Sequence, residues 1–339
     1  MAHPSPSAAM VASAFDLGHP IESLTPHRYG SFETWILTTI AGRFLVKRLW
    51  LGPEPEWRAA LERSMDFERR ARQGGLDMPV AIVPPRPAFG CAALVGSYGI
   101  FRVYEWLDHR PVDLGDDLSE WVGATLARLH QVEPLAGSQP EPEWYGLHPP
   151  ERWHDWLAAG EAQGRAWAPA LRQAVPVILK TSRWIADAFA NAGGYVLTHR
   201  DVEPWNVLIT DRGPVLVDWD TSGPDSAPLE AAQALLTFAT IGKAEPDPAR
   251  VRRGLAAYVD AGGAPLTSGR DLTARRAGLK LARLSERLQV TVGRIGAGST
   301  EPHKADIRAR EQLEELPGFL ADLTRWCALL EPGADPTFA

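Results

Sequence analysis

Short apolar and β-branched runs, separated by turn residues, dominate the first part of the chain. Residues 35–40 and 43–49 are two such runs, and Ala41-Gly42 between them predicts a hairpin turn. Further short runs follow at 80–83, 91–95 and 99–107. A helical pattern over residues 56–73 ends at Gly74-Gly75, as a helix C-cap would. This part of the chain therefore predicts a small, mainly antiparallel sheet that carries one helix.

Beyond residue 108 the hydrophobic period becomes helical. A stretch rich in Pro and Gly at 133–150 indicates a surface loop, and three short strands are predicted at 195–198, 207–210 and 215–217, the last two joined by a turn at 211–213. Helices are predicted at 118–130, 152–160, 168–175, 178–192, 229–239, 249–258, 272–292 and 305–330. The pattern is that of an α+β chain in which a larger, mainly helical lobe with a small hairpin follows the sheet.

Composition narrows the choice of protein class. The chain has 339 residues, 45% of them apolar, which suffices for two lobes. A net charge of −7 does not favour nucleic acid or an anionic membrane as partner. Cys91 and Cys327 form neither a disulfide framework nor a zinc pattern. The small, polar N-terminus lacks the layout of a signal peptide, so we expect a disordered tail over residues 1–14 and a cytoplasmic location.

The segment 197–220 carries the chemistry. Asn206 lies five residues after Asp201, and Asp218 lies twelve residues after Asn206, at the two ends of the predicted hairpin. A hairpin of this kind brings the three side chains to one end of its strands. Phosphoryl transfer requires such a set, because one carboxylate accepts the proton of the attacking hydroxyl while another carboxylate and an amide oxygen hold Mg²⁺. Each residue taken alone could equally be a turn former or a cap.

His199-Arg200-Asp201 with Asn206, followed by Val217-Asp218-Trp219, resembles the catalytic and metal-binding loops of the aminoglycoside phosphotransferase and choline kinase-like family. This resemblance implies a bilobal protein-kinase-like fold, with an N-lobe over residues 15–105 and a C-lobe over 106–339. It implies Asp201 as the catalytic base, and Asn206 and Asp218 as ligands of Mg²⁺.

Two departures from related patterns stand out. Arg200 occupies a position where this family more often has Gly, which leaves its role open. Trp219-Asp220 replaces the Phe-Gly of protein kinases, which favours a small-molecule substrate.

The resemblance also implies a nucleotide site for ATP, with GTP as an alternative. Lys47 would contact the α- and β-phosphates, and the backbone amides of Ser31 and Phe32 would lie near the β-phosphate. The adenine would bond with the carbonyl of Glu105 and the amide of Leu107. For the helix residue that pairs with Lys47, the apolar face of the helix favours Glu68 and the spacing within the family favours Glu62, so the choice stays open.

The acceptor site is expected beyond the catalytic loop. Its candidates are Glu203, Trp205 and Asp220, because acidic groups beside an aromatic face suit a small amine-bearing acceptor such as an aminoglycoside. The tryptophans of the helical part, including Trp153 and Trp156, could line this site or belong to the core.

The alternative functions are a metabolite kinase for an amino sugar, homoserine or choline-like acceptor, and a nucleotide-binding pseudokinase. A protein kinase is disfavoured because a recognisable Ala-Pro-Glu segment is lacking. We expect a monomer or a homodimer.

Overall fold

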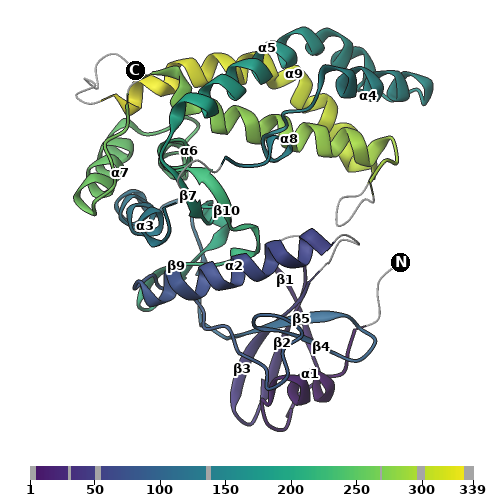
Figure 1. Ribbon diagram of the computed structural model, residues 1–339, viewed down its shortest axis with the longest axis vertical. Coiled ribbons are helices and arrows are strands. Elements are labelled where there is room, and N and C mark those ends of the chain that lie inside the picture. Colours follow the sequence, from purple (N-terminus) through teal and green to yellow (C-terminus); the bar gives the residue numbers. More distant parts are fainter. Residues whose placement is uncertain are drawn as a thin grey trace. The chain divides into compact units, whose positions relative to one another are not determined.

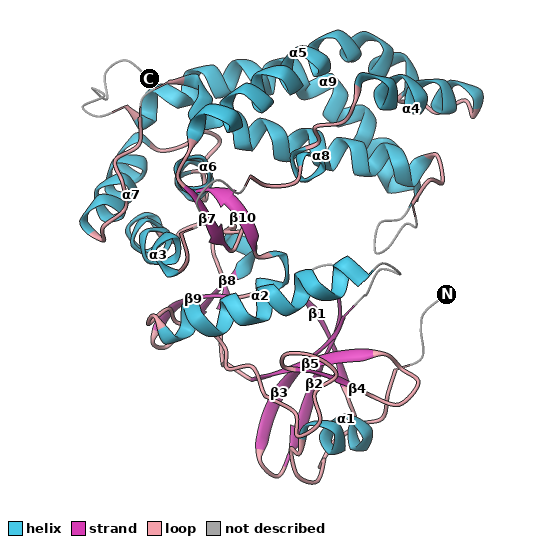
Figure 2. Ribbon diagram, in the orientation of Figure 1, coloured by secondary structure: helices cyan, strands magenta, loops and turns pink. Residues whose placement is uncertain are grey.

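The fold is described from a computed structural model, which covers residues 5–29, 32–49, 55–134, 139–267, 269–295 and 302–331. The chain divides into two compact units, residues 1–112 with 205–223 (unit 1) and residues 113–204 with 224–339 (unit 2). The mixture of strands and helices is α+β, as predicted (Figures 1 and 2). The observed division differs from the expected one at residue 105 in two respects: the first unit continues to residue 112, and residues 205–223 also belong to it.

Unit 1 is built on an antiparallel sheet of five strands in the order β1-β2-β3-β5-β4. Its strands are β1 (Thr25–Tyr29), β2 (Phe32–Thr39), β3 (Gly42–Leu49), β4 (Ala92–Leu94) and β5 (Ile100–Glu105). The predicted hairpin is β2–β3, which closes with Thr39 opposite Gly42. Gly42 has φ 138°, a value that residues other than glycine rarely adopt, so this position needs a glycine.

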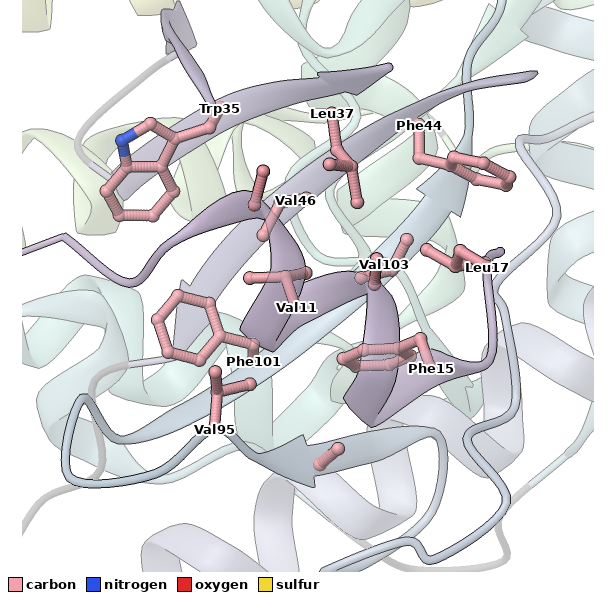
Figure 3. Packing of buried hydrophobic residues seen from close by; sticks show 13 residues of the cluster. Val11, Phe15, Leu17, Trp35, Leu37, Phe44, Val46, Val95, Phe101 and Val103 are labelled. Carbon is pink, nitrogen blue, oxygen red and sulfur yellow. The ribbon is translucent and has the colours of Figure 1, made fainter. Parts of the chain in front are cut away.

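Successive side chains of a strand point to opposite faces, so each strand of this sheet has two environments. Phe44 and Val46 of β3, with Phe101 and Val103 of β5, point to one face and are buried. There they pack with residues of α1 (Ala8–Phe15), as Figure 3 shows. Lys47 and Arg102 stand opposite each other on the neighbouring strands and have the other parity, so they point to the other face.

The prediction of a disordered tail over residues 1–14 is wrong for residues 8–14. Residues from Ala8 onward form α1, and Ser7 caps it by accepting a hydrogen bond from the Met10 amide (3.3 Å). Val11 and Phe15 are 0% and 2% exposed in the cluster of Figure 3. The small residues that look like a tail are what a short helix needs to lie close to a sheet.

Unit 1 also contains α2 (Pro55–Gln73) and a second sheet of three strands. This sheet has the order β6-β8-β9, with β6 (Arg110–Pro111), β8 (Val207–Thr210) and β9 (Gly213–Leu216). The predicted catalytic hairpin is therefore β8–β9. A 3-10 turn, η3 (Trp219–Thr221), follows it and contacts α2, where the Trp219 and Phe67 rings are 6.0 Å apart.

Unit 2 is mainly helical (Figure 2), apart from the two-stranded ribbon of β7 (Tyr195–Thr198) and β10 (Gly223–Ser226). In Figure 1, α5, α8 and α9 run side by side, and α3 lies against α6 and α7. The helices of unit 2 are α3 (Ser119–Val132), α4 (Pro150–Ala162), α5 (Ala168–Ala192), α6 (Ala227–Ala239), α7 (Pro248–Asp260), α8 (Ala274–Thr291) and α9 (Pro302–Trp326).

Two features of unit 2 differ from the sequence patterns. The helix predicted to break between 175 and 178 is continuous as α5, with Pro176 inside it. A buried face that includes Val175 and Ile178 continues on both sides of the proline, so tertiary packing outweighs the lost hydrogen bond. The loop expected over 133–150 contains a short 3-10 turn, η1 (Pro142–Tyr145), whose Tyr145 is 1% exposed.

Packing explains two further groups of residues. Trp153 and Trp156 of α4 are buried with their rings 5.0 Å apart at nearly a right angle, so they belong to the core. On α3, a Cβ at Gly123 would lie 2.1 Å from the carbonyl oxygen of Gly254 on α7, so this helix contact requires a glycine. No helix among the described residues is both long and apolar enough to cross a bilayer.

The burial of α1 predicts the effect of Phe15→Ala. Removing this ring should lower the free energy of unfolding by about 3 kcal/mol, because the cavity left under the sheet cannot fully collapse. The matched control is Ser13→Ala on the exposed face of α1, which should change it by less than about 0.5 kcal/mol. Denaturant unfolding followed by tryptophan fluorescence measures both. Equal, small effects would show that α1 adds nothing to the core of unit 1.

Candidate active site

The open end of the β8–β9 hairpin carries two of the predicted metal ligands, Asn206 and Asp218. Asn206 directly precedes β8, and its carbonyl accepts a hydrogen bond of 2.9 Å from the Val217 amide. This bond places Asn206 beside the residue that precedes Asp218. Asp218 has φ 68°, a left-handed backbone that side chains other than glycine rarely adopt. Strain of this kind is common where a side chain is aimed for function.

Lys47 of β3 makes two ion pairs on the face of the unit 1 sheet opposite α1. Its Nζ lies 2.6 Å from Asp218 Oδ1 and 2.7 Å from Asp220 Oδ2. Burial alone would lower the pKa of Lys47, but the charges and hydrogen bonds of the two carboxylates outweigh it, so the pKa is raised. The ammonium therefore stays charged where a phosphate could meet it.

Asp220 also serves a second buried cation. Arg102 of β5 is 0% exposed, and its Nη1 lies 2.7 Å from Asp220 Oδ1. The other Nη atom of Arg102 bonds with Glu68 of α2. The order of charges is thus Lys47, Asp220, Arg102, Glu68, alternating in sign.

This arrangement concerns the choice between Glu62 and Glu68 as the helix partner of Lys47, which the sequence left open. Glu68 is buried and reaches Asp220 through Arg102, whereas Glu62 is only partly buried and pairs with Arg58 at 3.2 Å. Helix α2 is therefore tied to the lysine through an arginine. The sequence analysis missed Arg102, although a charged residue at an apolar position within 100–105 is a signal that could have revealed it.

A pocket in unit 1 has the composition of a nucleotide site. Apolar side chains surround it, and Lys47 and Asp218 lie at its polar side. Glu105 and Leu107, predicted to bind the adenine through their backbones, are both among its lining residues. The pocket is lined by His27, Thr34, Leu45, Lys47, Pro79, Tyr104, Glu105, Trp106, Leu107, His109, Leu208, Val217, Asp218 and Trp219. Of the residues predicted near the β-phosphate, Ser31 lies outside the described residues and Phe32 begins β2.

The donors near this pocket fit a hard cation. Asn206 and Asp218 offer amide and carboxylate oxygens, which Mg²⁺ prefers. No group of three or more His, Cys, Asp or Glu side chains suited to a metal occurs among the described residues. A magnesium ion held by one carboxylate, one amide and the phosphates of a nucleotide needs no such group.

Unit 2 contains the loop with Asp201. Every residue of the stretch 195–203 is buried except Asp201, whose side chain is partly exposed. His199 is 0% exposed, and its Nδ1 accepts a hydrogen bond of 3.3 Å from the Asp201 amide. The loop is thus packed so that one carboxylate is accessible.

Glu230 of α6 fixes this loop through hydrogen bonds. Its Oε1 accepts from the Arg200 amide (3.0 Å), and its Oε2 accepts from the Thr198 hydroxyl (2.6 Å) and from His130 Nε2 (2.9 Å). Burial alone raises the pKa of Glu230, but His130 and the charge of Arg275 outweigh it and lower the pKa to about 2. His130 on α3 is therefore a structural partner of a buried carboxylate.

Arg275 of α8 also holds this loop, through the loop's backbone. Its Nη2 donates to the Arg200 carbonyl (2.6 Å), and its Nε donates to Asp225 (2.8 Å). Arg200 has φ 65°, so a residue other than glycine is kept in a left-handed conformation directly before Asp201. Glycine would adopt this conformation without strain. The Arg200 side chain packs over the Trp144 ring at 3.8 Å.

The predicted acceptor residues lie in different surroundings. Glu203 is 5% exposed and accepts from Gln233 Nε2 (2.8 Å), and burial raises its pKa. Asp220 is occupied by Lys47 and Arg102, as described above. Trp205 alone among the three is exposed, at 55%. Arg275 is absent from the predicted site residues, because an arginine within a helical pattern of mixed charge has no distinctive spacing.

Comparison with known proteins shows the family of the chain. The phosphotransferase enzyme family matches residues 25–266. The chain belongs to this family. Membership confirms the predicted class, an enzyme that transfers phosphoryl groups to hydroxyl groups. No curated protein matches the chain in sequence.

Solved structures of the family's kind share the fold. A spectinomycin phosphotransferase with ADP and spectinomycin superposes with a TM-score of 0.66 at 12% identity, over 95% of this chain and 99% of that one. An aminoglycoside phosphotransferase from Alicyclobacillus acidocaldarius gives 0.59 at 17% identity, over 96% and 98%. An amicoumacin kinase gives 0.58 at 15%, over 92% of each. These likenesses confirm the predicted kinase-like fold.

The shared position of Asp220 predicts the effect of Asp220→Asn. The change leaves Lys47 and Arg102 facing each other without their common counter-charge, so unfolding should become easier by about 3 kcal/mol. Denaturant unfolding measures this, with the exposed Asp77→Asn of the same unit as the control. A loss no larger than that of Asp77→Asn would refute the role assigned to Asp220.

The low pKa of Glu230 predicts how stability depends on pH. A carboxyl with a folded pKa of about 2 stabilises the fold fully above its unfolded pKa, near 4.5, and loses this stabilisation as the pH falls towards 2. Glu230→Gln should cost about 2 kcal/mol at pH 7 and flatten the fall between pH 5 and 2. Thermal unfolding across this range measures both, with the exposed Glu161→Gln as the control. Parallel pH curves for Glu230→Gln and the unmutated protein would contradict this account.

Proposed function

We propose that the protein is a kinase that transfers the γ-phosphoryl group of ATP, with Mg²⁺, to a hydroxyl of a small molecule. The observation that carries this proposal is the packing of residues 195–203, which buries every side chain but that of Asp201. A loop fixed by Glu230 and Arg275, with one accessible carboxylate, suits a general base that must be positioned but not neutralised.

The parts of the reaction are divided between residues already described. The pocket of unit 1 binds the nucleotide, with its adenine against the apolar lining near Glu105 and Leu107 and its phosphates at Lys47. Asn206 and Asp218 would hold the Mg²⁺, which would supply positive charge to neutralise the phosphates. GTP remains an alternative, since a backbone-mediated hinge reads the base only weakly.

The acceptor hydroxyl gives its proton to Asp201 as its oxygen bonds to the γ-phosphorus. The bond from that phosphorus to the β-phosphate oxygen breaks, and ADP is the leaving group. Lys47 lies next to the phosphates of ADP and stabilises their charge. The spectinomycin phosphotransferase structure contains ADP, and that of the amicoumacin kinase contains AMP-PNP with Ca²⁺. Nucleotides in proteins of the same fold support a nucleotide here.

The class of acceptor follows less directly. An amine-bearing acceptor rests on Glu203 and Asp220, and both carboxylates are buried and bonded within the protein. Asp220 lies with the phosphate-binding lysine, which favours a role on the nucleotide side. The residues of the pocket and the catalytic loop support the kinase reaction more strongly than they support any named acceptor.

The test compares two carboxylates with different roles. Asp201→Asn should reduce kcat by about 10²–10⁴ while leaving the Kd for Mg·ATP nearly unchanged, because a base acts only in the reaction. Asp218→Ala should instead weaken Mg²⁺-dependent nucleotide binding. ADP release with a panel of hydroxyl compounds gives kcat, and calorimetry with Mg·AMP-PNP gives the Kd.

The matched control is Asp211→Asn, an exposed carboxylate in the turn of the same hairpin, which should alter neither quantity. Equal, modest effects of Asp201→Asn and Asp218→Ala on both quantities would refute the assigned roles. Nucleotide binding without turnover on any acceptor, unaffected by Asp201→Asn, would favour the pseudokinase.

A further inference from the structure

Cationic side chains gather around a cavity between α8 and α9 of unit 2. The cavity has a volume of about 190 Å³ and is lined by Arg283, Glu286, Arg287, Val290, Lys304, Ala305 and Arg308. Four of these residues are basic and one is acidic. We call this site the basic cavity.

Helix geometry explains why these charges meet. Arg283 and Arg287 are four residues apart on α8, and Lys304 and Arg308 are four apart on α9, so each pair lies on one face of its helix. The two helices are packed together, and both faces border the same hollow. Solvated helices often carry such pairs singly, but two pairs around one cavity give it a strong positive potential.

The cations in this region also oppose one another. Burial lowers the pKa of Arg287, and the like charges of Arg283 and Arg308 lower it further, with Glu286 and Glu311 offsetting part of this effect. Arg276 lies about two turns before Arg283 on α8. Burial lowers its pKa, and the charge of Arg283 adds to this shift while that of Glu203 opposes it. An anion in the basic cavity would relieve this repulsion.

The basic cavity belongs to the neighbourhood of the catalytic loop. Arg283 acts electrostatically on Glu203, which lies two residues after Asp201. On the same helix, Arg275 bonds the Arg200 carbonyl, directly before Asp201. Arg283 lies eight residues further along α8, which is about 12 Å along the helix axis. An extended molecule, such as a sugar phosphate or a long-chain hydroxy acid, could reach from one place to the other.

Three acidic groups near the loop of Asp201 are engaged within the protein. Asp225 is bonded to Arg275 (2.8 Å), Glu230 to His130 (2.9 Å), and Glu203 to Gln233 (2.8 Å), and all three are buried. They offer little to an ammonium group. Of the five charged residues that border the basic cavity, four are positive.

We propose that the acceptor carries an anionic group, a carboxylate or a phosphate, which the basic cavity binds while the acceptor hydroxyl lies at Asp201. This inference rests on the proposed kinase function, since it concerns the substrate of the same reaction. It replaces the amine-bearing acceptor expected from the sequence with a hydroxy acid or a phosphorylated alcohol.

The first arm of the test measures turnover. ADP release is followed with matched pairs of hydroxyl compounds that differ in one anionic group: pantothenate and panthenol, gluconate and glucitol, glucosamine 6-phosphate and glucosamine. The anionic member of at least one pair should be the better substrate by tenfold or more in kcat/KM. The carboxylate and phosphate pairs distinguish the two kinds of anion.

Charge reversal then connects this preference with the cavity. The double variant Arg283→Glu/Arg308→Glu changes two exposed residues, so it should fold, which its unfolding temperature verifies. It should raise the KM of the anionic acceptor at least tenfold with the KM of Mg·ATP unchanged. The control is Arg183→Glu/Arg252→Glu, two exposed arginines of unit 2 outside the cavity, which alters net charge by the same amount.

The second arm is independent of turnover. Inorganic phosphate is titrated calorimetrically with Mg·AMP-PNP present to fill the nucleotide site. Saturable binding by the unmutated protein and by the control, lost in Arg283→Glu/Arg308→Glu, supports the inference. Binding equal in all three, or absent from the unmutated protein, overturns it.

The two arms separate the inference from the function on which it rests. Preferred turnover of neutral or cationic acceptors, insensitive to Arg283→Glu/Arg308→Glu, overturns the anionic acceptor and leaves the kinase intact. Phosphate binding that depends on the cavity, in a protein that binds no Mg·ATP, overturns the kinase and leaves an anion-binding site.

Discussion

A single carboxylate, Asp220, lets two cations share the interior of unit 1. Lys47 and Arg102 are cross-strand neighbours on β3 and β5, and like charges in such positions repel each other at close range. Asp220 lies within 2.7 Å of both. Without it, Lys47 would keep Asp218 and Arg102 would keep Glu68, but the two positive charges would face each other with no carboxylate between them. Asp220 thus connects the Lys47–Asp218 pair with the Arg102–Glu68 pair that ties α2 to the sheet.

Unit 2 also uses buried charged side chains to stabilise a local arrangement. The loop before Asp201 includes a left-handed residue, Arg200, whose amide and carbonyl are each held by a buried charged group, Glu230 and Arg275. In unit 1 the left-handed residue is Asp218, which pairs with Lys47. In both units, an unfavourable backbone conformation is stabilised by buried ionic contacts. Strain of this kind is retained where surrounding interactions over-determine it.

Much of this could be predicted from the sequence, because local patterns and short-range spacing report on local structure. The β2–β3 and β8–β9 hairpins follow from turn residues between alternating runs, and the family follows from the resemblance of the motifs around Asp201, Asn206 and Asp218 to its loops. The helix α1 and the continuity of α5 could not be foreseen in this way, since both depend on packing against distant segments. Arg102, Arg275 and the occupation of Asp220 depend on side chains far apart in sequence, which no local pattern reveals.

The bond between Arg275 and the Arg200 carbonyl joins residues 75 positions apart, and that between Lys47 and Asp218 spans 171. Contacts over such separations form late in folding, because long loops must close before the contacts can stabilise them. When the nascent chain has emerged from the ribosome up to residue 220, it contains Lys47, Asp201, Asn206 and Asp218. It does not yet contain Arg275, which holds the loop around Asp201. Activity should therefore appear only after α8 has been synthesised and has docked. The order of synthesis thus delays catalysis until most of unit 2 is complete.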